Sequence, residues 1–220
     1  MSSQGGWQGR QSAVRAPAPA RVAGGDASPP ADPDSDAALV AATALGSLPA
    51  FERLYRRHYR NLYRFVMRVT GRPEVTEEAI NDTFFVLWTK ADTFNGASRV
   101  STWLYGIAYR KAMKALSQAK PRGEQVDIDE QPDQANDAPL PSDHVETRET
   151  ARELTEAIAQ LPPGQRAVVE LTFFHGMSYA EIGDLLGCPV NTVKTRMFHA
   201  RSKLKAFLRA TGFEYPSVGG

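Results

Sequence analysis

Apolar side chains recur every three or four positions in two separate stretches of the chain, residues 51–119 and 143–209. This spacing gathers them on one face of an α-helix. Neither stretch alternates apolar and polar residues with period two, as a half-buried β-strand would. The pattern therefore predicts an all-α protein with two small helical domains.

The first stretch predicts three helices. The first begins near residue 51 and is ended by Gly71 and Pro73, since both residues interrupt helices. Thr76 can cap a second helix, because its hydroxyl oxygen can accept a backbone N–H of the first turn. A break at residues 93–98 precedes the third helix, which is expected to run to about Ala119.

The second stretch predicts two helices followed by a helix-turn-helix. Ser178 and Glu181 have the spacing of a capping box, which opens a short helix that ends at Gly187. A turn at residues 188–190 then leads into a longer helix at residues 191–209. Two helices joined by a short turn in this way are typical of DNA-binding motifs.

The longer helix has a composition suited to DNA, because residues 191–209 contain lysine and arginine but no acid. In such motifs the first turns of the second helix reach base edges in the major groove, while flanking cations neutralise phosphates. The residues expected to project away from its apolar stripe towards DNA are Asn191, Thr192, Lys194, Thr195, Arg196 and His199. The alternative is an ordinary basic surface helix.

Charge is distributed unevenly along the chain, although the total is only +1. Residues 50–120 carry 13 basic and 6 acidic side chains, residues 121–150 carry 2 and 9, and residues 151–220 carry 8 and 6. Near-neutrality therefore does not exclude a nucleic-acid partner. We expect the acidic segment to offset the basic faces and to weaken DNA binding by the free protein.

Composition predicts the boundaries of the domains. Residues 1–45 are rich in Ala, Pro, Gly and Ser, with few large apolar side chains, and are expected to be a disordered tail. The helical domains are then residues 46–120 and 150–210, joined by a flexible acidic linker at residues 121–149. A short C-terminal tail follows at residues 211–220.

Other features exclude several classes of protein. The single cysteine, Cys188, rules out an internal disulfide, and the four histidines are not spaced as metal ligands. The chain has no apolar run long enough to span a membrane and no secretory signal at its start, so we expect a cytoplasmic protein. No carboxylate pair, nucleophile–base set or phosphate-binding loop indicates an enzyme, and no cofactor is expected.

Aromatic and basic residues lie together around the break at residues 93–98. Phe94, Trp103, Tyr105 and Tyr109 alternate with Arg99, Arg110, Lys111 and Lys114. Rings that stack on unpaired bases, beside cations that follow the backbone, are typical of single-stranded DNA binding. Asn95 could offer polar groups to a base that leaves the duplex. The alternative is that these aromatic residues belong to the core.

Six segments of the chain carry a recognisable pattern: residues 51–59, 82–88 and 102–108 (FERLYRRHY, DTFFVLW and TWLYGIA), and residues 161–166, 179–183 and 191–196 (LPPGQR, YAEIG and NTVKTR) with Ala200-Arg201. The first three resemble region 2, and the last three region 4, of the extracytoplasmic-function (ECF) sigma factors of bacterial RNA polymerase. The resemblance covers about residues 50–118 and 150–208, in the order of the family.

The resemblance implies a function and a set of partners. Such proteins bind core RNA polymerase, direct it to a promoter and open the DNA at the nucleoid, and many are inhibited by an anti-sigma factor. Core polymerase would bind the second helix, at Glu78, Asn81, Asp82, Phe85, Val86 and Trp88. The −10 element would be melted and read by Asn95, Arg99, Trp103, Tyr105, Tyr109, Arg110 and Lys111. The −35 element would lie against residues 191–201, adding Arg201 to the residues already given.

Two positions depart from the family pattern. Tyr109-Arg110 stands where the family usually has Arg-Asn, and Pro189 replaces the usual serine before the recognition helix. Two other functions stay open at this point: a helix-turn-helix regulator that binds DNA alone, and a sigma-like decoy that only sequesters an anti-sigma factor. A regulator that binds DNA alone would need no acidic linker. The acid-free helix at residues 191–209 argues against a decoy that does not bind DNA.

Overall fold

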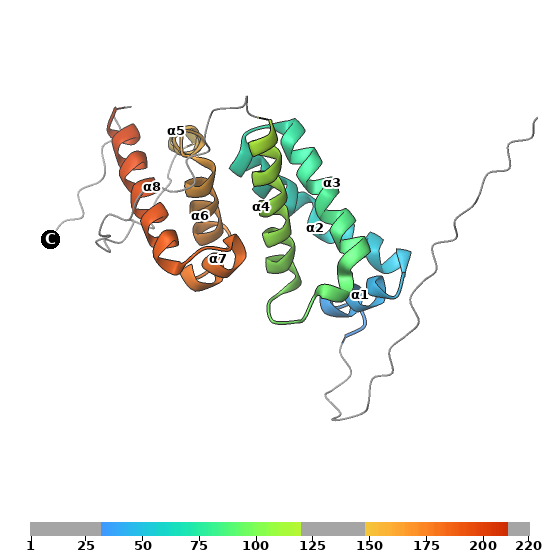
Figure 1. The fold of residues 1–220 in the computed structure, drawn as a ribbon. Helices are drawn as coiled ribbons and strands as arrows, with labels where there is room; N and C mark the ends of the chain where they lie inside the picture. The colour runs from blue at the N-terminus through green and yellow to red at the C-terminus, as the bar shows by residue number, and fades with distance from the viewer. Residues whose placement is uncertain (1–31, 120–147, 211–220) are drawn as a thin grey trace, which may run out of the picture. The chain divides into compact units, whose positions relative to one another are not determined.

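The computed structural model describes residues 32–119 and 148–210, which are helical with no strand among them. The first part holds α1 (Asp36–Ala44), α2 (Leu48–Thr70), α3 (Pro73–Lys90), the 3-10 turn η1 (Ala91–Thr93) and α4 (Val100–Gln118). The second part holds α5 (Arg148–Ala159), α6 (Pro163–Phe173), α7 (Tyr179–Leu186) and α8 (Val190–Ala210) (Figure 1). The all-α prediction is confirmed, whereas the acidic linker and the C-terminal tail lie outside the described residues.

The first part is built around α2. Ser47 caps this helix by accepting the N–H of Ala50 at 3.4 Å, and Gly71 ends it in the left-handed conformation, with φ 66°. Between them a stripe of side chains is almost fully buried against α1, α3 and α4: Leu54, Leu62, Phe65, Val66 and Val69. The predicted end at Gly71 is therefore confirmed.

Thr76 does not cap α3, so that prediction is wrong. The helix begins at Pro73, whose fixed φ suits the first turn and which has no N–H to leave unpaired. Thr76 lies one turn inside the helix and is fully buried, where its hydroxyl donates to the carbonyl of Arg72 at 2.8 Å and lies 3.0 Å from the hydroxyl of Thr70.

The predicted disordered tail is wrong for residues 36–44, which form α1. Ser35 caps this helix by accepting the N–H of Ala38 at 3.3 Å, and Leu39 and Val40 are only 4% and 2% exposed. The composition of residues 1–45 as a whole hides this short apolar helix. Residues 1–31 lie outside the described part of the chain.

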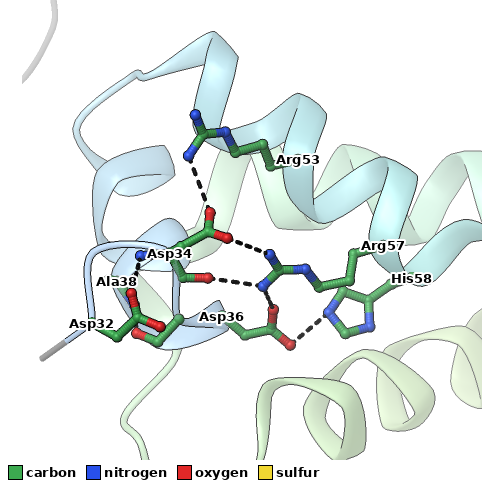
Figure 2. Close-up of polar contacts among 8 residues, drawn as sticks. Asp32, Asp34, Asp36, Ala38, Arg53, Arg57 and His58 are labelled. Carbon is green, nitrogen blue, oxygen red and sulfur yellow. Dashed lines mark hydrogen bonds and ion pairs between the residues drawn. The ribbon is translucent and has the colours of Figure 1, made fainter.

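Acidic side chains around the start of α1 attach it to α2 (Figure 2). Asp34 pairs with Arg53 at 3.1 Å and with Arg57 at 3.2 Å, and Asp36 pairs with Arg57 at 2.6 Å. The second oxygen of Asp36 lies 2.8 Å from Nε2 of His58, whose side chain is only 11% exposed. The charges of α1 and α2 are thus matched where the two helices meet.

The helix-turn-helix forms as predicted. The hydroxyl of Ser178 accepts the N–H of Glu181 at 3.3 Å, while a carboxylate oxygen of Glu181 accepts the N–H of Ser178 at 2.8 Å. The N–H and the hydroxyl of Ser178 both donate to this carboxylate, each at 2.8 Å, and hold the pKa of Glu181 below its ordinary value. Gly183 lets the turn come close to α7, because a Cβ there would lie 2.9 Å from the carbonyl oxygen of Cys188.

We expect Leu39→Ala to lower the free energy of unfolding by about 2–3 kcal/mol, because it removes a buried side chain and leaves a cavity. Leu45→Ala is the matched control, since Leu45 is 84% exposed and its truncation should change stability by less than about 0.5 kcal/mol. Urea denaturation measures both. Equal stability of the two variants would show that α1 does not pack on the core.

Candidate nucleic-acid interface

The recognition helix, α8, offers DNA fewer side chains than its sequence predicts. Asn191 and Lys194 are exposed, and Thr192, Arg196, His199 and Arg201 are partly exposed. Thr195 is only 8% exposed, so the prediction that it projects towards DNA is wrong. The reason is that α5, α6 and α7 all pack on α8, and the helix is therefore covered on more than one side.

Arg196, the predicted guanine reader, is held by other parts of the protein. Its side chain packs against Gly164 at the start of α6, and its Nη1 lies 3.8 Å from Sγ of Cys188. It also bonds to the hydroxyl of Tyr109 on α4. Burial raises the pKa of that phenol, while the bond and the charge of Arg196 oppose the rise. In this arrangement Arg196 is not free to read a base.

The structure divides the predicted aromatic cluster into two groups. At the start of α4, Trp103 packs on Phe94 with ring centres 5.3 Å apart, beside the exposed Asn95 and Arg99. The carboxamide oxygen of Asn95 accepts the N–H of Ala97 at 3.0 Å and shapes the loop before the helix. This group remains accessible.

The second group is buried. Tyr105 and Tyr109 are each 6% exposed, and the Tyr105 ring lies 5.0 Å from that of Phe65 and 4.5 Å from that of His175. Burial, aided by the negative charge of Glu170, raises the pKa of Tyr105 to about 12. These two tyrosines therefore belong to the core, as the alternative interpretation expects.

Two basic residues of α4 have intramolecular partners. Lys111 pairs through Nζ with Asp82 of α3 at 2.8 Å. Nη1 of the exposed Arg110 donates to the carbonyl of Leu185, at the end of α7, across 3.4 Å. A predicted −10 residue, Lys111, is thus joined to a predicted polymerase-binding residue, Asp82.

The predicted polymerase-binding residues share one face of α3. Glu78 and Asn81 are exposed, Asp82 and Val86 are partly exposed, and Phe85 and Trp88 are 64% and 39% exposed. Exposed aromatic side chains with polar neighbours are characteristic of protein-binding surfaces. We call Glu78, Asn81, Asp82, Phe85, Val86 and Trp88 the α3 face.

Sequence reasoning missed two aromatic residues of α2 beside this face. Phe51 lies 5.4 Å from Trp88 between ring centres, and Tyr55 is 37% exposed. Helical spacing places both close to the direction of Leu62 on the apolar stripe, so no local pattern distinguishes them from core residues.

Among residues 32–119 and 148–210, no three His, Cys, Asp or Glu side chains are grouped so as to hold a metal ion. Within the same residues, no helix combines the length and the apolar character needed to cross a membrane.

Comparisons with known proteins agree with this arrangement. Residues 54–122 match sigma-70 region 2, and residues 151–204 match sigma-70 region 4. The ECF RNA polymerase sigma factor SigM of Mycobacterium tuberculosis is 32% identical over 79% of this chain and 85% of its own. The RNA polymerase sigma factor CnrH of Cupriavidus metallidurans is 32% identical over 80% of this chain and 96% of its own.

A solved structure of CnrH in complex with the cytosolic domain of CnrY is similar to this one, with a TM-score of 0.54 and 26% identity over 80% of this chain and 97% of that one. The sigma factor RpoE of Bartonella quintana, solved with the anti-sigma factor NepR, has a TM-score of 0.53 at 22% identity and shows the same fold. The chain belongs to the ECF sigma factors of RNA polymerase, within the sigma-70 family.

Proposed function

We propose that the protein binds core RNA polymerase through the α3 face, brings it to a promoter and opens the DNA there. The observation that supports this most directly is the presence of two different surfaces in one chain. The α3 face is aromatic and acidic, as a protein-binding surface would be, whereas the exposed side of α8 is basic. A regulator that binds DNA alone would have no need of the first surface, and a decoy would have no need of the second.

For the −35 element, we propose contacts from Asn191, Thr192, Lys194, Arg196, His199 and Arg201. Asn191 and Lys194 are accessible in the free protein, whereas Arg196 must first leave Tyr109. Thr195 is omitted because it is buried.

For the −10 element, we propose that Asn95, Arg99 and Trp103 make the first contacts, since they are accessible at the start of α4. Tyr105, Tyr109, Arg110 and Lys111 would follow once their intramolecular contacts are released. Stacking on Trp103 and charge from Arg99 suit an unpaired strand.

We further propose that the protein acts at the nucleoid in the cytoplasm, catalyses no reaction itself and needs no cofactor. An anti-sigma factor is a proposed partner, because CnrH has been solved in complex with the cytosolic domain of CnrY, and RpoE of Bartonella quintana with the anti-sigma factor NepR. The domains that would carry these functions are residues 32–119 with α1 included, and residues 150–210.

The function is tested by run-off transcription with purified core polymerase and fragments of the source genome. We expect the protein to co-purify with core polymerase and to support initiation from a small set of fragments. A protein that neither binds core polymerase nor initiates on any fragment would contradict the proposal.

Phe85→Ala should weaken binding to core polymerase by about thirtyfold, because an exposed aromatic side chain at the centre of a protein interface contributes about 2 kcal/mol. The variant should fold normally, since Phe85 is 64% exposed. Leu45→Ala is the control, because it removes an exposed apolar side chain that is not part of the α3 face. It should bind core polymerase as the wild type does. Titration with core polymerase measures the dissociation constant of each variant. An unchanged dissociation constant for Phe85→Ala would show that this residue is not part of the interface.

Asn191→Ala should weaken binding of the polymerase complex to its −35 element by about 1–3 kcal/mol and relax the preference for one base pair. Asn61→Ala, at an exposed position of α2, makes the same chemical change outside the proposed interface. Fluorescence anisotropy with promoter variants altered at single −35 positions measures both effects. Equal discrimination by the two variants would show that Asn191 does not read a base.

A further inference from the structure

The exposed side of α8 overlaps only in part with the side that was predicted to face DNA. Residues three or four positions apart share one side of an α-helix. Thr195, which the prediction directed towards DNA, is only 8% exposed. Five exposed residues follow this spacing, and we call them the open side of α8: Asn191, Lys194, Phe198, Ser202 and Lys205.

Phe198 differs from the other four residues of the open side, because its side chain has no hydrogen-bond donor or acceptor. It is 36% exposed, and its ring meets that of His199 edge-on, with the ring centres 5.5 Å apart. Val190, at the start of the helix, is 39% exposed but leans on α7, since a Cβ at Gly183 would lie 3.6 Å from its Cγ2. Phe198 is therefore the apolar group that the open side offers to a partner.

The charges around Phe198 favour DNA as that partner. Lys194 lies about one turn before it and Lys205 about two turns after it on the same side, and residues 191–209 contain no acid. The exposed aromatic residues of the α3 face, in contrast, have acidic neighbours. An apolar group between cations is suited to a major groove, whose floor is formed by base edges and whose rims are phosphates.

Thymine is the base that an apolar side chain can recognise in this groove. Its C5 methyl is the apolar group among the base edges, whereas the other bases present donors and acceptors that a phenyl ring cannot satisfy. Covering one methyl group should strengthen binding roughly fourfold, given the usual gain from burying one apolar carbon. The contact therefore gives a preference for thymine without any hydrogen bond.

The distance between Asn191 and Phe198 relates this thymine to the base that Asn191 is proposed to read. The two residues are seven positions apart, which corresponds to about 10 Å along an α-helix. Successive base pairs are about 3.4 Å apart along DNA. A helix that lies along the groove would therefore place the two side chains about three base pairs apart.

We propose that Phe198 is a specificity-determining residue, whose ring packs on the C5 methyl of one thymine in the −35 element. The inference rests on the proposed function, because it names a base preference of the same DNA-binding helix. It adds to that helix a residue that carries no charge and forms no hydrogen bond with a base.

Replacing thymine with deoxyuridine tests the contact, because the replacement removes the C5 methyl and leaves base pairing intact. The probe is a fluorescein-labelled promoter fragment that supports run-off transcription, with each thymine of its −35 element replaced in turn. Anisotropy follows its binding to the complex of the protein with core polymerase. We expect one replacement to weaken binding by the wild type about fourfold. The same replacement should not weaken binding by Phe198→Ala, since the ring that covers the methyl is absent.

Phe173→Ala is the matched control. It makes the same chemical change at an exposed position of α6, where Phe173 is 48% exposed. This variant should lose binding on removal of the methyl as the wild type does. Each variant is compared with itself on two DNA fragments, so a smaller fraction of folded protein cannot imitate the result.

The outcomes separate this inference from the function on which it rests. Loss of the methyl effect in Phe198→Ala alone supports the contact. An effect that persists in Phe198→Ala, the lack of any effect in the wild type, or active promoters without thymine in the −35 element would each overturn it. Weaker binding of Phe198→Ala to core polymerase, with the methyl effect unchanged, would place Phe198 in a protein interface instead. If the wild type initiates on no fragment, the sigma-factor function itself fails and the inference falls with it.

Discussion

Burial of α2 on several sides is the constraint on which the rest of the structure depends. Its residues Leu54, Phe65 and Val69 are at most 1% exposed, and α1, α3, α4 and α6 all pack on it. The helix has 23 residues and several arginines, and its neighbours supply acids that pair with some of them. Asp34 and Asp36 do so near its start, and Glu170 does so near its end. The same helix therefore holds the first domain together and anchors the second.

Much of the fold follows from local rules that the sequence displays openly. Helical periodicity located α2, α4 and α8, and Gly71 and the pair Ser178–Glu181 marked ends that the structure confirms. The errors concern helix starts that depend on more than the local sequence pattern. The apolar residues of α1 are too few to stand out in an Ala/Pro-rich segment, and Pro73 preceded Thr76 as the start of α3 because its ring already has a helical φ.

The functional surfaces were harder to predict, because one helix can be covered by partners that are distant in sequence. The residues of the α3 face were implied by the resemblance to sigma factors, and the structure leaves all of them at least partly exposed. The aromatic residues of α4 were equally regular, but Tyr105 and Tyr109 are covered by His175 and Arg196, which lie about 70 and 87 residues away. Thr195 is buried because α5, α6 and α7 pack on its helix. No local pattern reports such contacts.

Gly183 has a consequence for the entropy of DNA binding. Because Gly183 has no side chain, α7 comes into close contact with the carbonyl of Cys188, and the two helices of the helix-turn-helix pack tightly at the turn. Ile182, Val193 and Met197, each at most 1% exposed, fill the angle between them. On the proposed function, the motif would enter the major groove with an internal order that was established during folding. Only the side chains at its surface have to be immobilised when DNA arrives, which leaves more of the contact energy for discriminating between sequences.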